Sequence, residues 1–226
     1  MIRNPLAIAI AIAALALAAG PAYAQKDIDK VNGSITAEAG ERYGTLSTVN
    51  GSIRIEAGAE VGDAETVNGA IRVADDAQAS SLETVNGSIR LGTGVQVGGD
   101  IETVNGSVFV DRAGRVAGDI ETVNGSIGLV DTDLAGSIET VNGDITVGID
   151  SHVQGGIKVE KPDNNWFPVS FGKREPQRIV IAQGARVDGP LVFEREVKLY
   201  VHATAQIGPV TGATAVRFEG DRAPQD

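Results

Sequence analysis

A short motif that recurs seven times at nearly constant spacing constrains the fold of this chain more than any other feature. The motif reads Val-Asn-Gly-Ser-Ile with small variations, and successive motif asparagines are 18 or 19 residues apart. A fixed period of about 20 residues is typical of solenoids, in which each repeat buries its apolar side only against its neighbours. The motif asparagines are Asn32, Asn50, Asn68, Asn86, Asn105, Asn124 and Asn142.

The residues that follow each motif alternate in polarity, which indicates strands and not helices. Ile53-Arg54-Ile55, Ile71-Arg72-Val73 and Ile89-Arg90-Leu91 place aliphatic side chains on one face and arginines on the other. Most of the aliphatic residues are β-branched, as in pleated sheets. We therefore predict an all-β, single-domain parallel β-solenoid (β-helix) with 18–19-residue rungs, where a rung is one full turn of the chain.

The Asn-Gly pair within the motif leaves an alternative, because Asn-Gly between apolar residues is also a strong hairpin signal. Seven hairpins would form an antiparallel meander. We favour the solenoid because whole repeats are alike, so that equal residues stack and the asparagines form a hydrogen-bonded ladder. Residues 121–138 illustrate one rung, with Ile127, Leu129, Leu134 and Ile138 at apolar positions. Which of Thr, Val and Asn points inward at the motif corner stays open.

The first 24 residues have the features of a cleavable signal peptide. One arginine, Arg3, precedes an apolar run of about 14 residues, and the segment ends Ala22-Tyr23-Ala24. Because a membrane-spanning helix needs about 20 apolar residues, we expect cleavage before Gln25, with an uncleaved anchor as the alternative.

Composition limits the cellular compartments and the partners that are compatible with the chain once the leader is removed. Without the leader, 18 basic and 30 acidic side chains give a net charge of −12, which argues against nucleic acid as a partner. The chain has no cysteine, so its stability depends on stacking and burial and not on disulfides. We predict an exported protein, periplasmic or extracellular, with no transmembrane segment in the mature chain.

The repeat pattern also gives the organisation of the chain. We predict regular solenoid repeats over residues 25–160, an aromatic and proline-rich insertion over 161–177, further rungs over 178–219 and a polar tail over 220–226.

The units at Glu83–Ile89 and Glu121–Ile127 resemble a large group of bacterial exported β-strand-repeat proteins that carry an adhesin label. The resemblance covers about residues 28–160 and implies a β-solenoid, but little about activity. Residues 184–193 are weakly similar to bactofilins, polymer-forming β-helices that lack a signal peptide. That difference argues against a cytoskeletal role.

Side chains at equal positions of successive repeats form columns, and three such columns, facing outward or at a corner, are candidates for binding. An acid column of Glu65, Glu83, Glu102, Glu121 and Glu139 is a candidate for weak Ca²⁺ binding through oxygen ligands, and a solvated acidic face is the alternative. Arg54, Arg72 and Arg90 form an arginine column that suits an acidic polysaccharide or phosphate groups, or else neutralises the acids. A threonine column consists of Thr48, Thr66, Thr84, Thr103, Thr122 and Thr140. It lacks the paired columns of ice-binding solenoids.

The insertion supplies a further candidate. Trp166, the only tryptophan, and Phe167 lie among three prolines and either dock a partner or cover the sheet.

Catalytic motifs are absent from the sequence. Its two histidines, His152 and His202, have no metal-ligand neighbours at useful spacing. We therefore predict a non-catalytic structural or adhesin-like protein without cofactors. It binds an envelope polysaccharide, a protein partner or, end to end, other copies of itself. A carbohydrate-binding module is one alternative, and a polysaccharide-active or acyltransferase-like enzyme is another.

Overall fold

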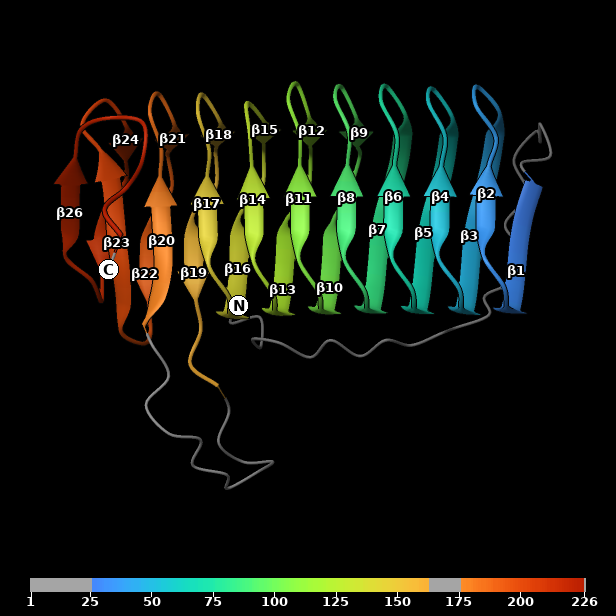
Figure 1. Cartoon of the computed structure of the whole chain (residues 1–226), viewed down its shortest axis with the longest axis horizontal. Coiled ribbons are helices and arrows are strands. Elements are labelled where there is room, and N and C mark those ends of the chain that lie inside the picture. The colour runs from blue at the N-terminus through green and yellow to red at the C-terminus, as the bar shows by residue number, and fades with distance from the viewer. Residues whose placement is uncertain (1–25, 163–175, 226) are drawn as a thin grey trace, which may run out of the picture.

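Parallel strands wind into stacked rungs that form one elongated solenoid (Figure 1). The computed structural model describes residues 26–162 and 176–225. All strand pairs among these residues are parallel, which confirms the solenoid and excludes the antiparallel meander. No helix in the described part of the chain is long and apolar enough to cross a membrane.

One sheet, here called sheet B, contributes a single strand to every rung, and its ten strands correspond to about ten turns. Its strands are β2 (Ile35–Ala37), β4 (Ile53–Ile55), β6 (Ile71–Val73), β8 (Ile89–Leu91), β11 (Val108–Val110), β14 (Ile127–Leu129), β17 (Ile145–Val147), β20 (Gln177–Ile181), β23 (Val197–His202) and β26 (Ala215–Phe218).

The second sheet, sheet A, begins as long strands and then divides into two arms. The long strands are β1 (Lys26–Asn32), β3 (Arg42–Asn50), β5 (Glu60–Asn68) and β7 (Gln78–Asn86). Strand β7 pairs with both β9 and β10, so the sheet forks there and each later rung has three short strands.

The two arms of sheet A form two further faces of the solenoid. One arm contains β10 (Ile101–Asn105), β13 (Ile120–Asn124), β16 (Ile138–Asn142), β19 (Ile157–Val159), β22 (Leu191–Phe193) and β25 (Val210–Thr211). The other contains β9 (Gln96–Val97), β12 (Arg115–Val116), β15 (Asp133–Leu134), β18 (His152–Val153), β21 (Arg186–Val187) and β24 (Gln206–Ile207).

Changes in rung length are absorbed at the corners and leave the strands in register. Between β7 and the next rung, Gln78 pairs with Gln96, 18 residues on, whereas Leu82 pairs with Ile101, 19 residues on. The extra residue therefore lies in the corner at residues 98–100. Because a one-residue slip within a strand would turn its apolar side chains outward, only the corners can accept an insertion.

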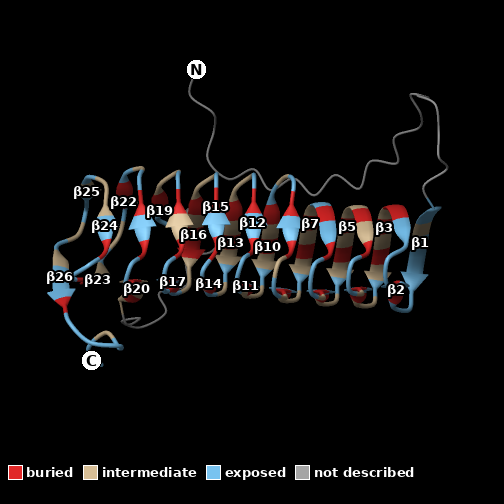
Figure 2. Ribbon diagram, turned by 90° about the horizontal axis from the view of Figure 1, so that it is seen from above, coloured by how far each residue is buried: buried red, intermediate tan, exposed pale blue. Residues whose placement is uncertain are grey.

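The core is a continuous cluster of mainly aliphatic residues. Figure 2 shows buried residues, in red, recurring along the stack of rungs. The predicted apolar positions Ile127, Leu129, Leu134 and Ile138 are all at most 1% exposed. Each fully buried side chain of this size contributes about 1.5–3 kcal/mol of hydrophobic stabilisation. Val123, in the same rung, instead lies partly exposed on the outside.

The motif glycine is required by close stacking. A Cβ on Gly125 would lie 1.8 Å from the carbonyl oxygen of Gly106 in the preceding rung. The same clash recurs at Gly87 against Gly69, at 1.9 Å. Any side chain at this corner would push adjacent rungs apart, which explains why glycine recurs with the period of the repeat.

The rungs resume with β20, whose first residue, Gln177, is the last residue of the predicted insertion. Strand β20 pairs with β17 across the insertion, and β23 and β26 complete three further turns. Beyond β26, residues 219–225 form no strand, and the Arg178 guanidinium donates a hydrogen bond of 2.6 Å to the Pro224 carbonyl oxygen. The predicted signal peptide and the aromatic pair Trp166 and Phe167 lie outside the described residues.

Candidate binding surface

The asparagine ladder forms as predicted along one outer corner. The Asn50 Nδ2 donates to the Asn32 Oδ1 at 3.1 Å, and the same bond repeats through six steps to Asn142 at 3.0–3.1 Å. The ladder has a direction, because each amide donates toward the N-terminal rung. At the C-terminal end Arg195 closes it, with Nη1 2.8 Å from the Asn142 Oδ1. The ladder therefore has a structural role.

The threonine column points inward, which answers the question that the sequence left open. Its hydroxyls are buried, and the Thr66 Oγ1 donates to the carbonyl oxygen of Gly51 in the preceding rung at 2.8 Å. The same bond recurs at Thr48, Thr84, Thr103 and Thr122. A buried column cannot present an ice-binding surface.

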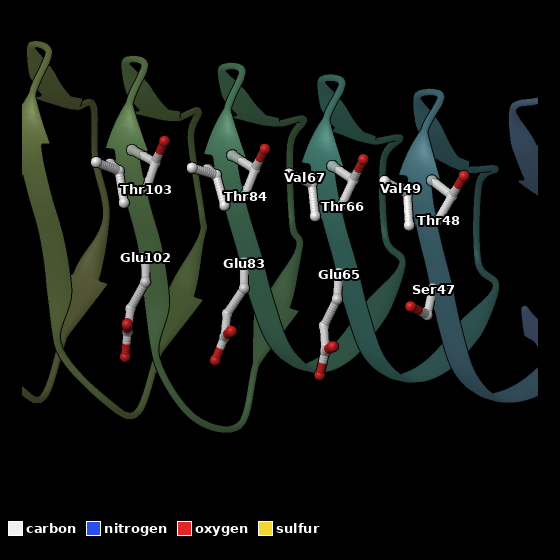
Figure 3. A pocket seen from close by; sticks show the side chains of 12 residues that line it. Ser47, Thr48, Val49, Glu65, Thr66, Val67, Glu83, Thr84, Glu102 and Thr103 are labelled. Atoms are coloured by element: carbon white, nitrogen blue, oxygen red, sulfur yellow. The ribbon is translucent and has the colours of Figure 1, made fainter. Parts of the chain in front are cut away.

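The acid column lies on the outer face of sheet A, beside a parallel column of valines. A shallow groove between them crosses four rungs, with Glu65, Glu83 and Glu102 along one side and the threonine backbone beneath (Figure 3). Its opposite side is formed by Val49, Val67, Val85 and Val104. The three carboxylates point the same way, away from the threonines.

Partial burial raises the pKa of every carboxyl in the acid column. Glu65, Glu83, Glu102 and Glu139 have pKa values above the usual 4.5, mainly because partial burial disfavours the charged form. The effect is greatest at Glu121, where burial, reinforced by Glu102 and Glu139, raises the pKa to about 7. Glu121 is therefore only partly charged near neutral pH.

The acid column does not gather its carboxylates around one point. Among residues 26–162 and 176–225, no group of three or more His, Cys, Asp or Glu side chains is arranged to hold a metal ion. At its C-terminal end the column meets Lys158, which pairs in register with Glu139 and forms an ion pair with Glu160. Weak Ca²⁺ binding to the column stays a prediction.

The arginine column lies on a different face from the acid column. Arg54, Arg72 and Arg90 pair in register on β4, β6 and β8 of sheet B, whereas the acids stand on sheet A beyond the motif corner. Within the described part of the chain, no ion pair joins Arg72 or Arg90 to an acid, and Arg54 reaches only Glu56, at 3.9 Å. The arginines are thus not the counter-charges of the acid column.

Phe109 continues the arginine column and was not singled out from the sequence. It pairs in register with Arg90 on one side and with Gly128 on the other, and it is 36% exposed. A Cβ on Gly128 would lie 3.3 Å from the Phe109 Cδ2, so the ring leans over the space that glycine leaves. Phe109 could have been recognised in the sequence as an aromatic residue at the outward-facing position of a predicted strand.

Hollows lie beside both ends of the arginine column. One is lined by Arg54 and Arg72 together with Ser34, Thr36 and Ser52. The other is lined by Arg90, Phe109, Ser107, Ser126, Asp144 and Thr146. Both combine guanidinium groups with hydroxyls, and the second adds an aromatic ring.

The two histidines lie on different faces and do not form a common site. On β18, the His152 Nε2 is 2.8 Å from the Asp188 Oδ2. This hydrogen bond, with that from Arg186, lowers the pKa of the Asp188 carboxyl. On β23, His202 is buried, and its ring packs edge-on against Phe218 at 5.2 Å.

Comparison of the chain with protein-family models, curated proteins and solved structures gives no match. The proposed function therefore rests on the fold and on the geometry of its faces.

Proposed function

We propose that this chain is an exported, non-catalytic structural or adhesin-like protein that binds through the lateral faces of a rigid solenoid. The observation that carries the proposal is the regularity of the stack, in which the same outward side chain recurs in register on consecutive rungs. Such a surface offers one contact many times along a line, which suits an extended or multivalent partner.

An envelope component or another protein suits this lateral surface, whereas further copies of the chain would bind at the ends of the stack. Self-association is supported by the ends of the stack. Among the described strands, β1 pairs only with β3, and β26 only with β23, so each offers an unpaired edge. Unpaired edges are templates for strand pairing unless they are covered.

The test begins with expression of the complete sequence. Mass spectrometry of the purified protein then shows whether the leader is removed before Gln25. Light scattering and negative-stain microscopy, with and without Ca²⁺, follow. Concentration-dependent rods support end-to-end assembly, whereas a monomer directs the search to lateral ligands.

Binding to isolated envelope fractions tests the adhesin-like role itself. Retention of the protein on these fractions supports the proposal. If the protein neither binds them nor assembles, and if it instead turns over an acyl or polysaccharide substrate with loss on His152→Ala, the proposal is wrong and the enzyme alternative is correct.

A further inference from the structure

We propose that the column Arg54–Arg72–Arg90–Phe109 on sheet B, here called the arginine track, is a binding site for an acidic polysaccharide lying along the solenoid axis. This inference rests on the proposed function, since it names the partner and the face that such a binding protein would use.

The arginine track carries an electrostatic cost. Three guanidinium groups stand at consecutive register positions, about one strand spacing of 4.8 Å apart. Like charges directly opposite one another on a sheet destabilise it. In a chain whose net charge is −11, nearby acids could have removed this repulsion. An anionic ligand would relieve it and gain charge-assisted hydrogen bonds to planar donors.

The side chains that flank Arg72 and Arg90 leave their guanidinium groups accessible to solvent. Arg72 lies between Ala70 and Ala74, and the corresponding neighbours of Arg90 are Ser88 and Gly92. None of these four side chains carries a charge, and none is long enough to cover an arginine. The guanidinium groups of Arg72 and Arg90 therefore face solvent and can reach a ligand that lies flat on the sheet, whereas Arg54 also has Glu56 within 3.9 Å.

At one end of the track the side chains change from arginines to an aromatic ring surrounded by hydroxyl groups. The exposed ring of Phe109 follows Arg90 directly, and the hydroxyls of Ser107, Ser126 and Thr146 line the adjoining hollow. The one acid in its lining, Asp144, accepts a hydrogen bond from the Arg178 backbone N–H at 2.9 Å. Aromatic rings pack against the apolar C–H face of a sugar, and hydroxyls exchange hydrogen bonds with its hydroxyl groups. The ring of Phe109 has no polar group that could donate a hydrogen bond to a phosphate. The combination therefore favours a sugar polymer that carries anionic groups.

The shape of the face agrees with a linear polymer. The track runs along the axis of the stack, perpendicular to the strands, because its residues are register partners on consecutive rungs (Figure 1). The acid column on the neighbouring face would repel a wide polyanion such as duplex nucleic acid, whereas a single narrow chain can lie on sheet B alone.

The test measures binding of the purified protein to polygalacturonate, which carries carboxylates, to dextran sulfate, and to neutral dextran. We expect binding to at least one acidic polymer and none to dextran. The two acidic probes distinguish carboxylate from sulfate as the recognised group. Arg72→Gln should weaken binding about tenfold or more, because a hydrogen bond to a charged group contributes about 1.5–3 kcal/mol.

The matched control is Arg115→Gln, which makes the same charge change on β12 of the other sheet. It should change the affinity by less than about twofold, because salt screens the effect of a charge that lies far from the binding site. Phe109→Ala leaves the net charge unchanged and should also weaken binding. Melting temperatures of all three variants show that each is folded.

Several results would overturn the inference. They are equal losses in Arg72→Gln and Arg115→Gln, absence of binding to both acidic polymers, or arginine-dependent binding to phosphatidylglycerol vesicles without binding to either polymer. If Arg72→Gln still binds envelope fractions as the unsubstituted protein does, the proposed function stands while the arginine track is excluded as its site.

Discussion

The raised pKa of Glu121 predicts that neutralising this residue stabilises the protein above neutral pH. The carboxyl has a pKa of about 7 in the folded chain against a usual value of 4.5. At 1.36 kcal/mol for each pH unit, this difference corresponds to about 3.4 kcal/mol. Because the carboxylate is partly exposed and screened by solvent, we expect about 1 kcal/mol from Glu121→Gln at pH 8.

The direction follows from proton linkage. The folded chain holds the Glu121 proton more tightly than the unfolded chain does, so protonation stabilises the fold. This stabilisation is complete below about pH 4.5 and is lost as the pH rises through about 7. The unsubstituted protein should therefore gain stability from this group between pH 8 and pH 5, whereas Glu121→Gln should lack that part of the pH dependence.

Thermal unfolding followed by circular dichroism measures the effect. In a chain of this size, about 1 kcal/mol shifts the melting temperature by about 2–4 °C. We expect Glu121→Gln to melt higher by this amount at pH 8 and almost equally at pH 5. Glu41→Gln, at an exposed corner, makes the same charge change and should shift neither value. A lower melting temperature for Glu121→Gln at pH 8, or an equal gain in Glu41→Gln, would refute the reasoning.

Three further pairs of substitutions test the stack, each by urea unfolding. Asn105→Ala removes two ladder bonds and should cost about 1–2 kcal/mol, whereas Asn32→Ala removes one and should cost about half as much; equal costs would contradict a continuous ladder. Gly125→Ala should cost about 3 kcal/mol through the clash with Gly106, against about 1 kcal/mol for Gly58→Ala, whose Cβ meets nothing within 4 Å. Ile120→Ala should cost about 2–5 kcal/mol and Val123→Ala less than about 1 kcal/mol, and a reversed order would show that the inward and outward assignments are wrong.

The sequence was sufficient to predict the fold because every repeat encodes the same pattern of strands and corners. The period, the parallel stacking, the asparagine ladder and the buried positions of Ile127 and Leu129 all follow from alternation and equal spacing. Where the structure adds detail, as in the fork of sheet A at β7, a one-residue change at a corner is the cause.

The orientation at the motif corner could not be predicted from polarity. Thr103 and Val104 are both β-branched and nearly equal in volume, so alternation alone would place valine inside. The structure buries Thr103 because its hydroxyl satisfies the Gly87 carbonyl oxygen, at 3.0 Å, which a valine would leave without that bond.

The candidate sites were less predictable than the fold. The sequence identified Arg54, Arg72 and Arg90, but it could not show that the acids lie on another face, because that depends on the angle at the Asn-Gly corner. It did not single out Phe109, whose significance comes from register with Arg90 and Gly128.

Disulfide trapping tests most directly the claim on which the ladder, the acid column and the arginine track all depend, namely that equal positions of successive repeats stack in register. The chain has no cysteine, so introduced pairs report without background. Glu65 and Glu83 are register partners about 4.8 Å apart, whereas Glu65 and Glu102 are two rungs, or about 9.6 Å, apart. Disulfides need Cα atoms within about 7 Å. Under mild oxidation we expect Glu65→Cys with Glu83→Cys to cross-link within the folded monomer, and Glu65→Cys with Glu102→Cys to stay reduced. Cross-linking of the second pair in preference to the first would contradict the in-register stack.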